Sequence, residues 1–369
     1  GQRLEPLVFG SSDGAAGGPA TVPVIPPTGS KSAHASILKM SDRQFGPNDG
    51  AIAIVGAGNF TKMAALPALV AANATIKSIV SAGGVSGTAL AKKYGIPYSS
   101  TDYPAILEDP DLRGVIITTR HNLHASQTVA ALRAGKCVLV EKPLCLSVAE
   151  LRDIEAAVMS SSAKGGWVTV GFNRRFSPHA EQMRKLLESS PAPLCVVATM
   201  NAGAIPLNHW VHDPEVGGGR LVGEACHFID FAIFLTRSLV TEVSVAALAG
   251  STDSASILLR HASGSTSVVN YFANGNRDLS KERVEVHADG RSLVLDNFRE
   301  LRGLGFRSFS QLKTKQDKGH ARQFSAFAER MKSGGSPLIP WAEIANCARA
   351  TLALSTAITE RRWVRVDEL

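Results

Sequence analysis

The chain has 369 residues, of which 44% are hydrophobic and 19% are charged, a balance that is typical of a folded protein with room for two domains. The formal net charge of +7 suits an anionic ligand such as a nucleotide, but Lys and Arg are scattered along the chain, which argues against nucleic acid binding. The sequence contains no uncharged apolar run of about 18 residues, so we expect no membrane span.

The cysteines and histidines give no sign of a metal site. Five cysteines, odd in number and widely spaced, match neither a zinc pattern nor a disulfide framework. His209 and His212 are spaced like metal ligands, yet no further ligand completes a set with them, so no metal is predicted. Reduced thiols and the absence of a signal peptide favour a cytoplasmic protein.

Residues 1–49 differ in composition from the rest of the chain. They are rich in Gly, Ser, Pro and Ala and show no sustained period of 2 or 3.6 residues, which predicts a flexible linker or tail. Two folded domains are expected after it, a dinucleotide-binding domain over residues 50–171 and a second domain over residues 172–369.

The first motif is a glycine turn between a strand and a helix. Residues 51–55 form an apolar run that is typical of a buried parallel strand, and Gly56-Ala57-Gly58 and an Ala/Leu-rich helix follow it. Backbone N–H groups of such a turn approach a pyrophosphate, whose charge the helix N-terminus favours. The third small position of the fingerprint is Thr61, which is bulkier than the usual Gly or Ala. Gly56, Gly58, Asn59 and Phe60 are the predicted cofactor contacts here.

The end of the second strand bears on the choice between NAD and NADP. Residues 76–81 read as this strand, and Ser81 stands where a dinucleotide fold often places an acid. A carboxylate there would hold the ribose 2′-OH and repel a 2′-phosphate. Ser81 is a predicted cofactor contact that permits NADP, and because no Arg in this loop demands it, the preference for NADP over NAD is slight.

Strands and helices continue to alternate as far as Gly171. Apolar strands over 114–119, 136–140 and 167–170 alternate with helices, which predicts a parallel, doubly wound Rossmann sheet. Ligands of such sheets lie beyond the carboxyl ends of the strands, so this edge would hold the next cofactor contacts. They are Thr119, Arg120, His121, Glu141 and Lys142. Arg120 would stack on adenine or meet a phosphate, and a solvated loop arginine is the alternative.

Beyond Gly171 the sequence becomes rich in strands. Runs over 194–201, 240–248, 255–260, 266–272, 283–287 and 292–295 are mostly joined by short turns and predict a large, open, mostly antiparallel sheet. Helices are expected over 318–332 and 341–359. The predicted fold class is therefore α/β, with the Rossmann domain followed by an α/β domain.

Two places carry candidate catalytic groups. Lys142 follows a buried strand, where it would lie beside a nicotinamide and orient a substrate hydroxyl; a surface lysine paired with Glu141 is the alternative. A triple glycine precedes an apolar helix in which Glu224, His227 and Asp230 are three residues apart, on adjacent turns. A histidine with a carboxylate neighbour is a plausible general base, and a core histidine is the alternative.

Together these motifs resemble the Gfo/Idh/MocA family of nicotinamide-dependent sugar and polyol oxidoreductases. The resemblance covers residue 50 to the end and is carried by GAGNF at 56–60, VLVEKPL at 138–144, VGFNRRF at 170–176, and W-x-x-D-x-x-x-GGG with H-x-x-D over 210–230. In detail the chain is most similar to the second half of bi-domain oxidoreductases, in which a zinc alcohol dehydrogenase-like module comes first. NAGAIP at 201–206, GEACHFID at 223–230 and QDKGH at 316–320 carry this narrower likeness.

The resemblance implies roles for individual residues. By position, Lys142 is the family's Glu-Lys-Pro lysine and His227 its catalytic histidine, while Gly223 stands where the family often has Asp. Glu224 or Asp230 would then be the partner of His227. Substrate contacts are expected from Asn173, Arg174, Trp210 and Asp230.

The sequence therefore predicts an NAD(P)-dependent oxidoreductase that acts on a secondary hydroxyl, or the corresponding ketone, of a sugar, nucleotide sugar or polyol. The resemblance implies a homodimer or homotetramer, and the narrower likeness implies fusion to or pairing with a zinc alcohol dehydrogenase-like module. Two alternatives remain open, an epimerase or eliminase that oxidises its sugar transiently, and a sensor that binds the cofactor or sugar without chemistry.

Overall fold

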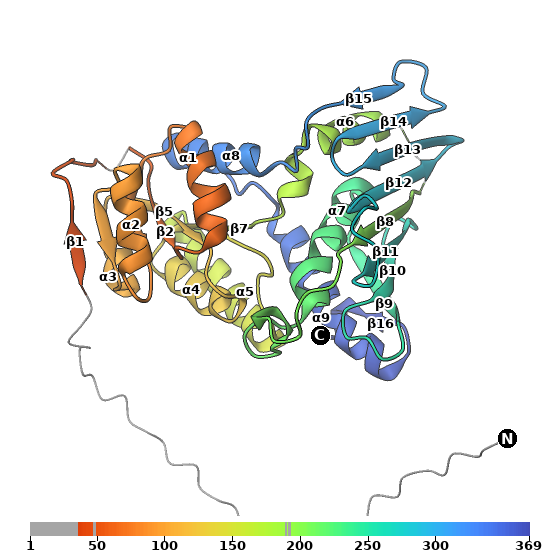
Figure 1. Ribbon diagram of the computed structural model, residues 1–369, viewed down its shortest axis with the longest axis horizontal. Coiled ribbons are helices and arrows are strands. Elements are labelled where there is room, and N and C mark those ends of the chain that lie inside the picture. Colours follow the sequence, from red (N-terminus) through yellow and green to blue (C-terminus); the bar gives the residue numbers. More distant parts are fainter. Residues whose placement is uncertain (1–35, 47–48, 189, 191–192) are drawn as a thin grey trace, which may run out of the picture. The chain divides into compact units, whose positions relative to one another are not determined.

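The computed structural model describes residues 36–46, 49–188, 190 and 193–369. These belong to one unit that begins at Ser36, and it contains two sheets with their helices (Figure 1). Residues 1–35, most of the expected linker, lie outside the described residues. None of the helices in the described ranges is long and apolar enough to cross a bilayer.

The first sheet is the predicted Rossmann sheet. Its order is β1-β4-β3-β2-β5-β6-β7, and every neighbouring pair is parallel except β1 and β4. The strands are β1 (Ile37–Lys39), β2 (Ala51–Val55), β3 (Ile76–Val80), β4 (Tyr98–Ser100), β5 (Leu112–Ile117), β6 (Cys137–Val140) and β7 (Val168–Val170). All five residues of β2 are buried, because helices cover both faces of the sheet.

Part of the expected linker belongs to this sheet. Ile37–Lys39 forms β1 and pairs antiparallel with β4 in the register Ile37 to Ser100. A strand of three residues is too short to show a period in the sequence, so only its pairing with β4 reveals it.

The helices of the first domain follow the strands. They are a π-turn η1 (Thr61–Ala65) that continues into α1 (Leu66–Ala71), then α2 (Val85–Tyr94), α3 (Tyr103–Leu107), α4 (His121–Arg133), α5 (Val148–Ser161) and the 3-10 turn η2 (Ser162–Lys164). The start of α5 is fixed by a complete capping box between Ser147 and Glu150. Left-handed Gly95 ends α2.

The second sheet is mostly antiparallel. Its order is β15-β14-β13-β12-β8-β11-β10-β9-β16, and the central pair β8 and β11 is parallel. The strands are β8 (Cys195–Asn201), β9 (Val240–Ala247), β10 (Ala255–His261), β11 (Thr266–Phe272), β12 (Glu282–Ala288), β13 (Arg291–Asp296), β14 (Glu300–Leu304), β15 (Gln311–Lys313) and β16 (Val364–Arg365). The expected α/β architecture is thus confirmed, and the β14–β15 hairpin extends the sheet beyond the predicted strands.

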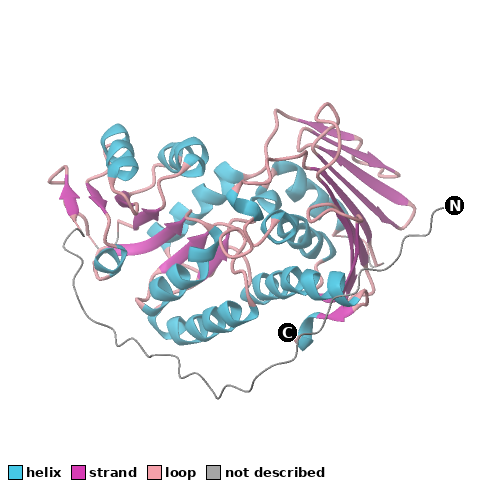
Figure 2. Ribbon diagram, turned by 60° about the horizontal axis from the view of Figure 1, so that its bottom comes forward, coloured by secondary structure: helices cyan, strands magenta, loops and turns pink. Residues whose placement is uncertain are grey.

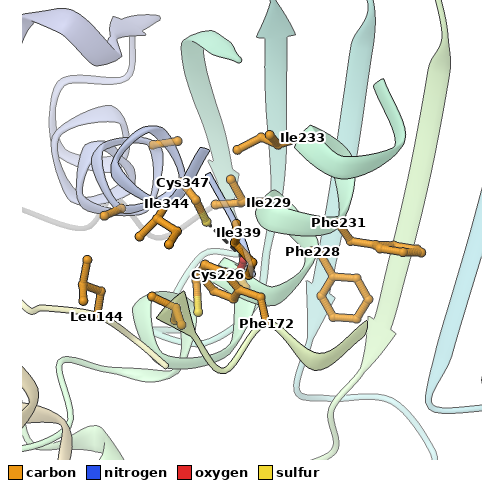
Figure 3. Packing of buried hydrophobic residues seen from close by; sticks show 14 of the residues in the cluster. Leu144, Phe172, Cys226, Phe228, Ile229, Phe231, Ile233, Ile339, Ile344 and Cys347 are labelled. Carbon is orange, nitrogen blue, oxygen red and sulfur yellow. Dashed lines mark hydrogen bonds between the residues drawn. The ribbon is translucent and has the colours of Figure 1, made fainter. Parts of the chain in front are cut away.

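Helices cover one face of the second sheet (Figures 1 and 2). They are α6 (Pro178–Leu187), α7 (Cys226–Thr236), which the π-turn η5 (Leu221–Ala225) precedes, and α9 (Trp341–Glu360). The second domain also contains the short 3-10 turns η3 (Asn173–Phe176), η4 (Trp210–His212) and η6 (Val366–Glu368). Almost every residue of α7 is buried, because it lies between the sheet and α9. In Figure 3, Cys226 and Ile229 lie toward Ile344 and Cys347 of α9, and Phe228 and Phe231 lie on the other side of the helix. This packing fixes the orientation of His227, which follows Cys226.

Helix α8 (His320–Ser333) returns to the first sheet. It packs against α1 and η1, and Phe324, Phe327 and Met331 join the core that surrounds β2 (Figure 1). A segment near the end of the chain therefore contributes to the nucleotide-binding half. As a result, His320, the first residue of α8, reaches the edge where the cofactor is expected.

Candidate active site

A cavity of about 700 Å³ lies at the carboxyl ends of β2, β5 and β6. Loops of the second domain close its other side, and the volume is in the range of small-molecule sites. Most of the predicted site residues line it, namely Gly56, Gly58, Asn59, Phe60, Thr119, Arg120, His121, Glu141, Lys142, Asn173, Trp210 and His227. Ser81, Arg174, Glu224 and Asp230 do not.

The glycine turn has the conformation that a pyrophosphate requires. Gly56 has φ 108, and a Cβ there would lie 2.6 Å from Thr118 Oγ1, so only glycine fits. A Cβ at Gly58 would meet no protein atom within 4 Å, which leaves this backbone open toward the cavity. The turn therefore fits a dinucleotide, whose pyrophosphate its backbone would hold.

Thr61 is accommodated by hydrogen bonds. Its buried hydroxyl donates to the Gly56 carbonyl at 2.8 Å and lies 2.7 Å from Thr118 Oγ1. The larger side chain thus connects the turn to the loop after β5. A threonine at the third position of the fingerprint is compatible with the motif for this reason.

The side chain of Ser81 forms a hydrogen bond within the first domain and does not line the cavity. Its Oγ accepts a hydrogen bond from the Gly87 N–H at 3.2 Å, which directs the side chain toward α2. The neighbouring Ala82 lines the cavity in its place. Ser81 therefore does not line the cavity, whereas Ala82 does, and the contact of Ser81 with a cofactor stays a prediction.

Lys142 is held at the junction of the two domains. Its Nζ donates to the Gly223 carbonyl at 2.9 Å. Gly223 lies within the π-turn η5, and π-turns interrupt the regular i to i+4 pattern of carbonyl acceptors. A backbone carbonyl thus takes the position of the aspartate that the family resemblance implies.

His227 is a buried imidazole on the same cavity. Burial, together with the nearby charges of Arg174 and Lys142, holds its pKa well below the usual value, so the ring is neutral near pH 7. Its Nδ1 has no hydrogen-bond partner within the described part of the chain. A neutral ring is the form that can accept a proton.

Neither predicted carboxylate partner reaches His227. Glu224 accepts a hydrogen bond from the Tyr271 hydroxyl at 2.7 Å. Asp230 is fully buried in a bidentate ion pair with Arg175, whose other nitrogen contacts Glu343 at 2.7 Å. The expectation that one of them orients His227, and that Asp230 contacts the substrate, is therefore wrong. Packing of α7 positions the ring instead.

Arg174 lies one layer behind the cavity. Its guanidinium donates twice to Glu282, both at 2.9 Å, and Lys318 contacts the same carboxylate at 2.6 Å. The side chain is thus used in a buried ion-pair network, and the prediction of direct substrate contact is corrected to a supporting position behind Asn173.

His121 attaches a loop of the second domain to α4. Its Nδ1 lies 2.8 Å from the Gly217 carbonyl, which can only accept, so Nδ1 carries the proton. Its ring packs edge-on against Trp210 with centroids 4.7 Å apart, and burial lowers its pKa to about 3. The Arg120 guanidinium lies over the ring of Trp210, 4.1 Å from the ring centroid.

Two histidines of the cavity were not predicted. His320 packs near Phe60, with ring centroids 5.9 Å apart, and its Nδ1 lies 3.5 Å from Asn173 Nδ2. Only the return of α8 brings it there; the motif QDKGH at 316–320 ends in this residue, but the motif alone does not place His320 in the cavity. His124 lies one turn after His121, a spacing that could have indicated it, and its Nδ1 is 2.7 Å from the Pro143 carbonyl.

The described residues contain no group of three or more His, Cys, Asp or Glu side chains that could hold a metal ion.

A Rossmann sheet whose glycine turn faces a lysine and a neutral histidine defines the protein as a dinucleotide-binding oxidoreductase. Sequence comparison gives the particular family. An oxidoreductase family with an NAD-binding Rossmann fold matches residues 51–172, and the GFO/IDH/MocA C-terminal domain matches residues 192–294. The chain belongs to the Gfo/Idh/MocA family.

Relatives with known names cover most of the chain. Inositol 2-dehydrogenase of Rhizobium meliloti is 26% identical over 340 residues, which are 85% of this chain and 98% of the relative. Myo-inositol 2-dehydrogenase of Thermotoga maritima is 24% identical over 75% of this chain and 87% of the relative.

Solved structures share the fold. An oxidoreductase domain protein from Kribbella flavida has a TM-score of 0.76 at 24% identity, over 85% of this chain and 98% of that one. Levoglucosan dehydrogenase in complex with NADH and levoglucosan has a TM-score of 0.74 at 22% identity, over 86% of this chain and 99% of that one.

Proposed function

We propose that the protein is an NAD-dependent dehydrogenase that oxidises a secondary hydroxyl of a sugar or polyol, or reduces the corresponding ketone. One observation carries the proposal: Lys142 and His227, from different domains, line the same cavity as the glycine turn. The named inositol dehydrogenases and levoglucosan dehydrogenase support the substrate class.

The residues have complementary tasks in this reaction. Neutral His227 would accept the proton of the substrate hydroxyl, and Lys142, held by the Gly223 carbonyl, would donate a hydrogen bond to that oxygen. Asn173 and His320 would hold the neighbouring hydroxyls. Bound NAD supplies the acceptor for the hydride that leaves the substrate carbon. Burial of His227 excludes water from the proton transfer.

Single substitutions test these roles. We expect Lys142→Met and His227→Gln each to lower turnover by roughly 100-fold or more, while the affinity for NADH stays within several-fold. His287→Gln, an exposed histidine on β12, is the matched control and should leave turnover unchanged. Normal turnover in His227→Gln would remove the imidazole from the mechanism.

The cofactor is proposed to be NAD. The matching domain is described as NAD-binding, and levoglucosan dehydrogenase was solved with NADH. The slight preference for NADP rests only on the loop 81–86, which offers neither a carboxylate to repel a 2′-phosphate nor an arginine to bind it. Titration of the protein fluorescence with NADH and NADPH decides between them, and tighter binding of NADPH would contradict the proposal.

The same two residues would also serve a transient oxidation, as in an epimerase or eliminase. The two activities differ in one observable, because only a dehydrogenase accumulates NADH at 340 nm during turnover. A sensor without chemistry would keep the cofactor site but has no need for both Lys142 and His227.

The assembly, the partner module and the location of the protein are also proposed. The helix-free face of the second sheet is proposed as the interface of a homodimer or homotetramer (Figure 2). Sedimentation of the purified chain tests whether it is a homodimer or homotetramer. The narrower likeness at 201–206, 223–230 and 316–320 supports a zinc alcohol dehydrogenase-like module as a fused or paired partner.

The location is proposed to be the cytoplasm, because the cysteines are free and four of them are buried.

A further inference from the structure

The charged side chains that line the cavity leave it positive. Among the described residues they are Arg120, Lys142 and Glu141. Burial raises the pKa of Glu141 to about 7, so its carboxyl is partly neutral at physiological pH. That carboxyl also packs against Gly171, where an added Cβ would lie 2.6 Å from Oε1, so its position is fixed on the sheet side. Neither cation has a full negative partner.

A second layer adds to this charge. Glu282 is shared between Arg174 and Lys318, so this buried group of two cations and one anion carries a net positive charge. The two segments that hold it also carry Asn173 and His320 of the cavity wall. Positive charge behind the wall favours a negative ligand in front of it.

Arg120 is placed to bind such a ligand. Its exposed guanidinium stacks 4.1 Å from the Trp210 ring centroid, which fixes the plane of the group. No hydrogen bond or ion pair joins this guanidinium to any residue that the structure describes. An arginine stacked in this way presents its N–H groups in the geometry that binds a carboxylate or phosphate through two hydrogen bonds.

The hydrogen-bond partner of Lys142 is also consistent with an anionic ligand. The position that would hold an aspartate is Gly223, and its carbonyl holds the lysine without neutralising it. The charges that act on His227 are accordingly those of Arg174, Lys142 and Lys318, all positive. Glu282 offsets part of this charge, and an anionic substrate would offset more of it than a neutral polyol.

We propose that the substrate is an anionic sugar, whose carboxylate or phosphate binds Arg120 on the Trp210 ring while its reactive hydroxyl lies at Lys142 and His227. This rests on the proposed function. Arg120 is thereby assigned to the substrate, because Trp210 comes from the second domain, whereas the pyrophosphate would lie at Gly56 and Gly58.

Binding and kinetics together test the proposal. The probes are myo-inositol as the neutral compound, glucuronate as the carboxylate and glucose 6-phosphate as the phosphate, each titrated calorimetrically into the NADH-saturated protein. We expect one of the two anions to bind at least tenfold more tightly than myo-inositol. The anion that binds more tightly identifies the charged group.

Variants at the two ends of α4 complete the test. Arg120→Gln should weaken binding of the preferred anion at least tenfold and raise its KM similarly, Arg120→Lys should recover part of the loss, and NADH affinity should stay within twofold. Arg133→Gln, at the other end of the same helix, is the control. Preference for myo-inositol, or an Arg120→Gln effect on NADH as large as that on the anion, would overturn the proposal. Arg120-dependent binding of an anion that is never oxidised would support it and contradict the proposed function.

Discussion

Two π-turns adjoin the cavity, η1 directly after Phe60 and η5 shortly before His227, and they are stabilised in different ways. At η1 the side-chain contacts stay within the first domain, because Thr61 donates to the Gly56 carbonyl and lies 2.7 Å from Thr118 Oγ1. At η5 the contact joins the two domains, because Lys142 reaches the Gly223 carbonyl from 81 residues away. Just before η5, His121 likewise reaches the Gly217 carbonyl from 96 residues away. The glycine turn is thus held by contacts within the first domain, whereas the loops of the substrate half are held by contacts between the two domains.

This difference predicts where each half is vulnerable. Damage at the glycine turn should impair the ligand site and leave most of the fold intact. Damage behind η5 should weaken the fold, because buried ion pairs and α7 support that side.

The largest expected effect is at Asp230. Asp230→Ala leaves Arg175 buried with only the partly exposed Glu343, and removing one partner of a buried pair costs about 3–5 kcal/mol. Urea unfolding measures the change. Asp367→Ala, in an exposed pair with Arg365, is the control and should change stability little. A loss at Asp230 no larger than that of the control would show that the substrate half does not depend on its ion pairs.

Acid should destabilise both halves. Burial holds the pKa of His121 at about 3, those of His124 and His320 at about 4, and that of His227 well below its usual value. Their contribution is complete above pH 6.5, the ordinary value, and is lost as the pH falls, because only the unfolded chain takes up these protons. The raised pKa values of Glu141, about 7, and of Asp230, about 6, act in the opposite direction. These two carboxyls oppose the four histidines of the cavity together with His179 and His261, whose pKa values burial also lowers.

We therefore expect the Tm to fall by several degrees between pH 6.5 and 5 at constant ionic strength. His320→Asn removes one of the four groups and should make the decline shallower. A Tm that rises over this range would contradict the assignment of the four histidines as neutral.

The two glycines of the turn separate folding from ligand binding. Gly56→Ala forces a Cβ to within 2.6 Å of Thr118 Oγ1 at φ 108 and should cost about 1–3 kcal/mol. Gly58→Ala meets no protein atom, so its Tm should be unchanged while NADH affinity falls at least tenfold. Unchanged NADH binding in Gly58→Ala would place the pyrophosphate elsewhere.

The smallest effect is expected at Glu224. Because its carboxylate bonds to Tyr271 and not to His227, Glu224→Gln should lower turnover by less than about threefold. Tyr271→Phe removes the same hydrogen bond from the other side and should behave alike. A 100-fold loss in Glu224→Gln with normal stability would restore this residue to the catalytic group.

The sequence predicted most of what depends on local pattern. Apolar runs identified β2 and β11 within a residue, and the glycine turn and the Lys142 strand end were recognisable as motifs. The antiparallel character of the second sheet followed from its short turns.

What it could not predict depends on pairing between distant segments. The strands β1 and β4 have three residues each, too few to show a period. His320 enters the cavity only because Phe324 and Phe327 pack α8 onto the first core. Helical spacing placed Glu224 and Asp230 near His227, but it could not show that Tyr271 and Arg175 engage them.

The short strand β1 has a consequence for handling this protein. Open edges of sheets recruit strands from other molecules, and three residues that end in Lys39 offer little for such pairing. A chain trimmed to begin at residue 50 would expose the backbone of β4 instead. We therefore expect a protein that lacks the residues before 50 to self-associate through the exposed edge of β4.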